Sequence, residues 1–255
     1  MTFVHPTFGV LHLGRHSPSP RNARTMAKAF HFHDYLAALP DPPSSWDSTG
    51  GLTAAWGMML NDVEGDCTCA ACGHLIQSWT ISSGGPTGEV TVPDSAIQLA
   101  YEKACGYDPA DPASDQGGVI SNVLDYFRDV GIGGHRISAH AEVNLTQLRI
   151  SQAISLVGAI DIGIELPVSA QSQVGGLWDF IADSPDAAGG WGGHSVAVVQ
   201  YDPSGLSCVT WGRLQKMTWR WFEYYCDEAH AAISPDYKRL SGVNNLSDEL
   251  NALGS

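Results

Sequence analysis

The spacing of hydrophobic residues predicts helices in the first half of the chain and strands in the second. Apolar side chains recur every three to four positions, the helical period, in four segments: 67–81, 95–107, 119–131 and 148–159. Short β-branched runs bounded by turn residues predict strands at 159–166, 192–202, 207–212 and 228–234. Helices followed by strands indicate an α+β protein with two unlike halves and a cleft between them.

The flanks of this pattern suggest how the chain is divided. Residues 1–45 are rich in Pro, Ser and Arg and are expected to form an N-terminal arm, with one short helix near 24–39. The folded domain is expected over 46–240, with a helical lobe at about 60–140 and a sheet lobe at about 150–235. Residues 241–255 are expected to form a C-terminal tail.

Composition and charge exclude several classes of partner. The chain carries 27 acidic against 13 basic residues, a net charge of −14, so nucleic acid and anionic membranes would repel it. There is no run of about 18 apolar residues and no secretory signal pattern, so we expect no membrane association. Six cysteines without an export signal predict free thiols and a cytoplasmic or otherwise reducing compartment. The oligomeric state is not predicted.

One stretch, LNDVEGDCTCAACGHLIQSW at 60–79, concentrates the reactive side chains. Cys67, Cys69, Cys72 and His74 raise the possibility of a zinc site, but structural zinc sites usually pair two ligand knuckles a dozen or more residues apart. On a helix, Cys67 and His74 cannot both join the face that Cys69 and Cys72 share. We therefore expect no metal and no cofactor, and we interpret Cys69 and Cys72 as small buried hydrophobes.

The alternative is that one thiol is a nucleophile. Cys67 stands where a loop enters a helix, and the N–H groups and partial positive charge of a helix N-terminus favour a thiolate there. Asn61, six residues earlier, offers a side-chain amide that could stabilise an oxyanion. His194 begins a predicted core strand after two glycines and is the candidate base.

Taken in order, these features resemble papain-like cysteine peptidases. The resemblance covers about 45–235 and rests on PPSSWD, the Asn61–Gly65–Cys67 spacing, DQGGVISNVLDYFRDVGI, ISQAISLVGAIDIGIEL, GGHSVAVVQYD and VTWG. It implies a helical N-terminal lobe and an antiparallel β C-terminal lobe with an interlobe cleft. It also implies Cys67 as nucleophile and His194 as its base.

The sequence departs from the family pattern at three positions. Asn61 replaces the Gln that donates to the oxyanion, and Glu64 stands where a disulfide cysteine would be. The Asn that orients the imidazole is absent from VTWG; Thr210 is the possible orienter there, with Asp202 as a second candidate. Trp211 either shields the imidazole from water or is a plain core aromatic.

The resemblance implies a cysteine-dependent hydrolase, most directly a peptidase that acts on peptide or protein substrates through an acyl-enzyme. The N-terminal arm would then be propeptide-like if it lies in the cleft. Two alternatives stay open: a catalytically silent papain-like binding or assembly module, and a transferase or deamidase that uses the same Cys–His pair.

Overall fold

A computed structural model describes residues 1–17, 41–51, 56–180 and 186–238 of the chain. The helix predicted near 24–39 and the predicted tail at 241–255 lie outside the described residues.

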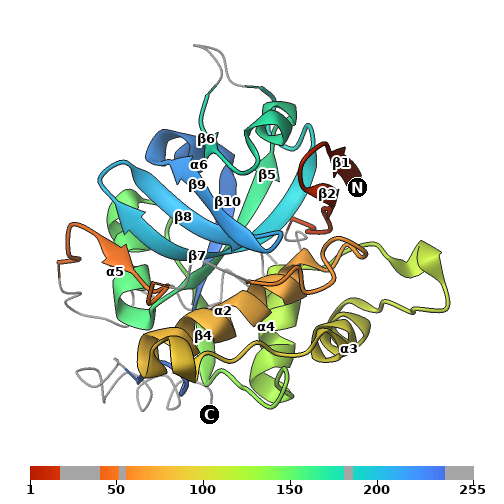
Figure 1. Cartoon of the computed structure of the whole chain (residues 1–255), viewed down its shortest axis with the longest axis horizontal. Helices are drawn as coiled ribbons and strands as arrows, with labels where there is room; N and C mark the ends of the chain where they lie inside the picture. The colour runs from red at the N-terminus through yellow and green to blue at the C-terminus, as the bar shows by residue number, and fades with distance from the viewer. Residues whose placement is uncertain (18–40, 52–55, 181–185, 239–255) are drawn as a thin grey trace.

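Three helices form one layer of the molecule (Figure 1). They are α2 (Cys67–Gly84), α3 (Asp94–Cys105) and α4 (Ile120–Asp129). Every residue of α2 from Cys67 to Ile81 is buried, because the sheet, α3 and α4 all pack against this helix. The three helical segments were predicted from the apolar period. Asp94 is the first residue of α3 and makes no side-chain cap, so its carboxylate acts only through its charge at the helix N-terminus.

Eight of the described strands form one sheet that is antiparallel apart from one edge pair. Its order is β4 (Ala139–Glu142), β10 (Cys226–Ile233), β5 (Ile160–Leu166), β7 (Gly192–Asp202), β8 (Gly205–Thr210), β9 (Arg213–Thr218) and β6 (Leu177–Trp178), and β3 (Trp46–Asp47) also pairs with β7. This antiparallel-rich α+β architecture confirms the predicted fold class.

Strand β7 separates two hydrophobic cores. Val196 and Val198 belong to the core that includes α5 (Gln147–Val157) and α6 (Trp219–Tyr225), whereas Ala197 and Val199 face α2, α3 and α4. Successive side chains of a strand point to opposite faces, so a strand between two layers is apolar throughout. Short 3-10 turns at Pro86–Gly88, Pro112–Ser114 and Val168–Gln173 complete the loops.

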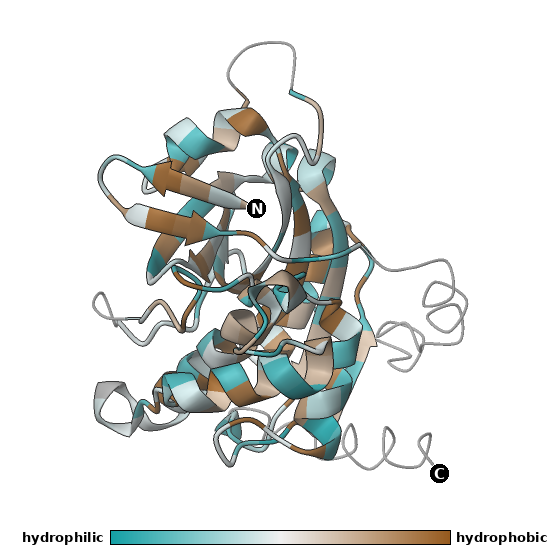
Figure 2. Cartoon of the chain, turned by 90° about the vertical axis from the view of Figure 1, so that its right-hand side faces the viewer, coloured by the Kyte–Doolittle hydropathy of each residue, from teal (hydrophilic) through white to brown (hydrophobic). Residues whose placement is uncertain are grey.

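The first residues of the chain form a hairpin that the sequence analysis does not predict. Strands β1 (Thr2–His5) and β2 (Gly9–His12) pair in register, and Figure 1 shows them beside the sheet. Phe3 packs edge-on against Trp191 with ring centroids 5.4 Å apart. In Figure 2 the chain that leaves β2 crosses between the sheet and the helices.

Among the described residues, no helix combines the length and the apolar character needed to cross a membrane.

Candidate active site

The sulfur of Cys67 lies at the N-terminal end of α2. Asp66 is the N-cap residue, and its carbonyl accepts the N–H of Cys69 at 2.7 Å and of Ala70 at 3.0 Å. Cys67 itself is only 1% exposed. The backbone N–H groups of Ser195 and Gly14 donate to the sulfur, so it contacts both the sheet and the N-terminal segment.

His194 lies near the start of β7, one residue before the Ser195 N–H that contacts the sulfur. Its Nε2 is 2.7 Å from Thr210 Oγ1 at the end of β8. The ring of Trp211 stacks on the imidazole, with centroids 4.5 Å apart and planes at 13°. Nδ1 is buried and has no hydrogen-bond partner among the described residues. One ring nitrogen is therefore held, and the other is available as a base.

The structure joins His194 to Thr210 by a hydrogen bond and links Cys67 to the same strand through the backbone of Ser195. The hydrogen bond that an orienting Thr210 requires is present, and the catalytic roles of Cys67, His194 and Thr210 stay predictions. Asp202, the second candidate, makes no hydrogen bond to the imidazole in the described structure. Its Oδ1 accepts the N–H groups of Ser204 and Gly205 and closes the turn between β7 and β8.

Asn61 is buried beside the helix N-terminus, but its amide is already engaged. Nδ2 donates to Glu64 O at 3.3 Å and to Asp66 Oδ1 at 3.2 Å. The preceding Met59 and Leu60 both have positive φ, 51° and 71°, so the turn that carries Asn61 is strained. The oxyanion role of Asn61 stays a prediction that requires an N–H to turn away from these oxygens.

Burial keeps both reactive groups neutral in this conformation. The pKa of the Cys67 thiol is raised to about 12, chiefly by burial and to a smaller extent by Asp66 and Asp161, despite the two N–H donors. Burial, and then the positive charge of Arg15, lowers the pKa of His194 to about 3. Transfer of the thiol proton to the imidazole is therefore strongly disfavoured while the site is closed.

The site is closed by residues 12–16, which pass between the two lobes and bond to both. On the helical side, His12 N donates to Asn61 O at 3.1 Å, Gly118 N to Gly14 O at 2.6 Å, and His16 N to Gly118 O at 2.8 Å. On the sheet side, Arg15 N donates to Gly193 O and Trp211 Nε1 to His12 O, both at 3.2 Å. The interlobe space beside Cys67 is thus filled by the chain itself.

Sequence reasoning raised a propeptide-like N-terminal arm in the cleft but did not identify residues 12–16 as the segment that lies there, although one signal was visible. Glycines stand at the closest approaches: a Cβ on Gly14 would lie 1.7 Å from Gly65 O, and one on Gly117 would lie 1.7 Å from Gly14 O. A Cβ on Gly193 would lie 2.4 Å from Arg15 O. Glycine is used where two backbones must approach closely, but a single sequence does not say which backbones meet.

The other candidate metal ligands of the cysteine-rich helix are buried. Cys69 and Cys72 are fully buried, and His74 Nδ1 lies 2.9 Å from Gln77 Oε1. All six cysteines are free thiols. Within the described ranges, no group of three His, Cys, Asp or Glu side chains is arranged to hold a metal ion.

Comparison of the sequence with protein-family models gave no match, and comparison with curated proteins gave no significant match. The structure, by contrast, is similar to solved proteases. Xylellain, a cysteine protease from Xylella fastidiosa, has a TM-score of 0.61 at 13% identity over 88% of this chain and 95% of its own. Procathepsin B from Trypanosoma congolense has a TM-score of 0.53 at 11% identity over 89% of this chain and 86% of its own.

Digestive procathepsin L 3 of the Tenebrio molitor larval midgut has a TM-score of 0.55 at 12% identity, covering 78% of this chain and 72% of its own. These identities are too low to transfer an activity, but the similarity extends over most of each chain. The chain has the fold of the papain-like cysteine proteases.

Proposed function

We propose that the chain is a cysteine-dependent hydrolase that cleaves peptide bonds and that residues 12–16 hold it in a closed form. The observation that carries the proposal is the placement of His194. Its Nε2 is bonded to Thr210, and its buried Nδ1 has no partner among the described residues. The next residue, Ser195, contacts the Cys67 sulfur through its backbone N–H. A thiol at a helix N-terminus beside an oriented imidazole is the arrangement that thiol nucleophiles need.

In the proposed reaction, His194 Nδ1 takes the proton of the Cys67 thiol, and the sulfur attacks the carbonyl carbon of a peptide bond. The backbone N–H of Cys67 and, once released, the amide of Asn61 stabilise the oxyanion. His194 returns the proton to the departing amine, which leaves a thioester. Water, deprotonated by the same nitrogen, then hydrolyses the thioester and regenerates the thiol.

Occlusion by residues 12–16 fits this proposal as a form of self-inhibition. The group that Gly14 presents to the sulfur is an N–H donor, which a thiol does not attack. The segment also excludes solvent from both reactive groups, which accounts for the neutral thiol and imidazole. The N-terminal arm would thus act as a propeptide does, by occupying the place of a substrate.

One set of observations favours the rival, a silent binding module. The amide of Asn61 is committed to Glu64 and Asp66, and the Cys67 sulfur is inaccessible. A direct assay distinguishes the hydrolase from the silent binding module. The full chain and its Gly14→Ala variant are incubated with a library of peptides, and new peptide ends are mapped by mass spectrometry.

If the protein is a hydrolase, the Gly14→Ala variant should cleave peptides more rapidly than the wild-type chain. Cleavage should disappear in the double variant Gly14→Ala/Cys67→Ser. No cleavage, with no faster alkylation of Cys67 than of the other thiols, would establish the silent module. Peptide ends joined to an added amine instead of water would indicate a transferase.

Thiol alkylation needs a position-resolved readout. Cys105 is the partly exposed cysteine of the described chain, and a hydrogen bond with Cys69 is the main cause that lowers its pKa. In the closed protein we therefore expect iodoacetamide at neutral pH to label Cys105 before Cys67. Peptide mapping of the labelled protein checks this order, and earlier labelling of Cys67 would contradict the closure by residues 12–16.

Thr210 should position the imidazole rather than react. Thr210→Val removes the 2.7 Å hydrogen bond and nearly preserves shape, so kcat/KM for peptide cleavage in the Gly14→Ala protein should fall about tenfold. Thr210→Ser keeps the hydroxyl and should retain most activity. The pH–rate profile should shift in the Val variant alone, since that hydrogen bond acts on the charged imidazole. Equal rates for Val and Ser would remove Thr210 from the mechanism.

A further inference from the structure

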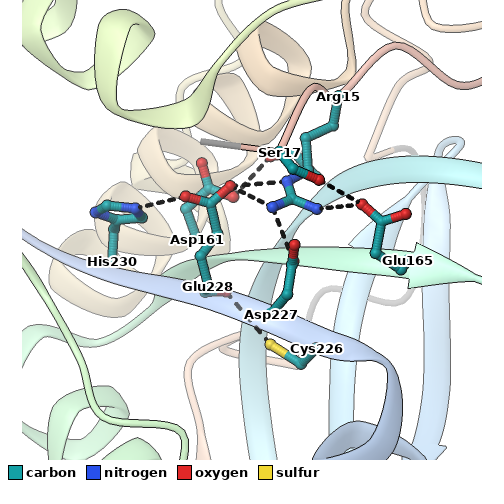
Figure 3. A network of polar contacts seen from close by, with 9 residues as sticks. Arg15, Ser17, Asp161, Glu165, Cys226, Asp227, Glu228 and His230 are labelled. Carbon is teal, nitrogen blue, oxygen red and sulfur yellow. Dashed lines mark hydrogen bonds and ion pairs between the residues drawn. The ribbon is translucent and has the colours of Figure 1, made fainter. Parts of the chain in front are cut away.

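The side chain of Arg15 enters an acidic cluster next to the candidate active site (Figure 3). The cluster consists of Glu165 on β5 and of Asp227 and Glu228 on β10. Arg15 Nε and Nη2 donate to Glu228 Oε1 at 2.8 and 2.5 Å, Nη1 to Glu165 Oε1 at 3.0 Å, and Nη2 lies 2.8 Å from Asp227 Oδ1. The Arg15 side chain is 0% exposed and that of Glu228 is 1% exposed.

The backbone around the cluster is shaped for a guanidinium. A Cβ on Gly163, on β5, would lie 2.4 Å from Arg15 Nε and 2.5 Å from Cζ, so glycine is needed to admit the planar group. The pairing of β10 with β5 is irregular between Cys226 and Glu228. Neighbouring residues on a regular strand point to opposite faces, and this bulge allows Asp227 and Glu228 to contact the same cation.

The cluster holds more negative charge than Arg15 neutralises. Three carboxylates and one guanidinium leave a formal charge of −2 (−3 + 1). Close to Glu228, the buried carboxyl group of Asp161 has an oxygen, Oδ2, without a hydrogen-bond partner in the described part of the chain, and burial raises the pKa of this group well above its ordinary range. His230 Nε2 lies within hydrogen-bond distance of Glu228 Oε2, at 3.1 Å. Burial raises the pKa of Glu228, but His230 and Arg15 lower it more, so Glu228 is ionised at neutral pH.

The acidic cluster lies close enough to the Cys67 sulfur for one residue of a bound peptide to reach it. Arg15 follows directly on Gly14, whose N–H contacts the Cys67 sulfur, and its own N–H bonds to Gly193 beside His194. The occluding segment therefore presents one side chain to the cluster while its backbone lies across the reactive thiol. A substrate that replaced this segment would place a side chain in the same cluster.

We propose that Glu165, Asp227 and Glu228 form an arginine-recognition site for peptide substrates, occupied in the closed protein by the chain's own Arg15. This inference rests on the proposed function. The site should prefer arginine to lysine, because three different nitrogens of the guanidinium contact carboxylates on two strands. Arg15 then anchors the occluding segment by imitating a substrate.

The first test measures binding without catalysis. In Arg15→Ala the cluster is vacated, and millimolar N-acetyl-arginine amide should raise the Tm by about 3 °C. N-acetyl-citrulline amide, which has the same shape without the charge, should have no effect. The response should vanish in Arg15→Ala/Glu228→Gln and persist in Arg15→Ala/Glu223→Gln, where the same substitution is made at an exposed acid on α6. Equal responses to both compounds, or a response that survives Glu228→Gln, would overturn the proposal.

The second test retains Arg15 and measures specificity. The Gly14→Ala protein should cleave arginine-containing peptides at least about 30-fold better, in kcat/KM, than the same peptides with citrulline, and Glu228→Gln should bring the two close to parity. Cleavage without any arginine preference would overturn the recognition site and leave the hydrolase standing. Arginine-dependent binding in the first test without cleavage in the second would overturn the hydrolase and leave the recognition site standing.

Discussion

Replacing Gly14 with alanine should increase the rate at which iodoacetamide labels Cys67 by about 100-fold, because the new methyl group cannot coexist with Gly65 O. The closed protein exposes only 1% of Cys67, so labelling must wait for residues 12–16 to leave. Their docking includes several backbone hydrogen bonds of ordinary net strength. Loss of a few such bonds accounts for a change of this size.

The control for this substitution is Gly84→Ala at the exposed end of α2, where an added Cβ meets nothing within 4 Å. It should leave the labelling of Cys67 unchanged. Cys105 serves as an internal reference, because its rate should be the same in both variants. A uniform increase at all six thiols would indicate general destabilisation, and an unchanged rate at Cys67 would show that residues 12–16 do not protect the sulfur.

Opening should also change the chemistry of the site, not only its access. Burial is the main cause that raises the pKa of Cys67 and lowers that of His194, and Arg15 adds to the second effect. When water enters and Arg15 departs, both pKa values move toward their ordinary range, and proton transfer from thiol to imidazole becomes less costly. Residues 12–16 therefore both block access to the sulfur and disfavour proton transfer from the thiol to the imidazole.

The parts of the fold that were predictable are those where one local signal dominates. The apolar period of α2 and the β-branched run of β7 are strong, and β7 was predicted with its observed limits, Gly192–Asp202. Strand β9, RLQKMT, was missed because only Gln215 and Met217 are buried in it. The β1–β2 hairpin was missed because each strand has four residues and gains its stability by packing on distant elements such as Trp191.

The residues of the candidate site also differ in how far local sequence pattern could locate them. The places of Cys67 at the start of α2 and of His194 near the start of β7 were predictable, because the ends of a helix and a strand can be located from local pattern; their catalytic roles stay predictions. Arg15 was not, because its partner Glu228 lies 213 residues away and no local feature of LGRHS indicates a buried cation. Long-range pairing of charges is decided by the assembled sheet, including the bulge at Asp227, and a single sequence carries no record of it.

The second large effect concerns His194. In the Gly14→Ala background, His194→Ala should reduce kcat for peptide cleavage by about 1,000-fold, within the range that general acid–base catalysis supplies. In the closed wild-type protein the same substitution should change Cys67 labelling little, because access limits that reaction. His135→Ala is the matched control: this histidine is bonded to Asp236 at 2.8 Å, away from the sulfur, and its loss should leave cleavage unchanged.

The pH dependence of alkylation separates a base from a structural residue. With His194 present in the opened protein, an imidazolium favours the thiolate, so Cys67 should be labelled at pH values well below the ordinary thiol pKa. With His194→Ala, the thiolate loses the imidazolium and keeps only the helix N-terminus and the Ser195 N–H, so the rate should rise at higher pH, closer to the pKa of an ordinary thiol. If both proteins gave the same profile, His194 would act through packing alone, against Trp211, and the hydrolase proposal would lose its base.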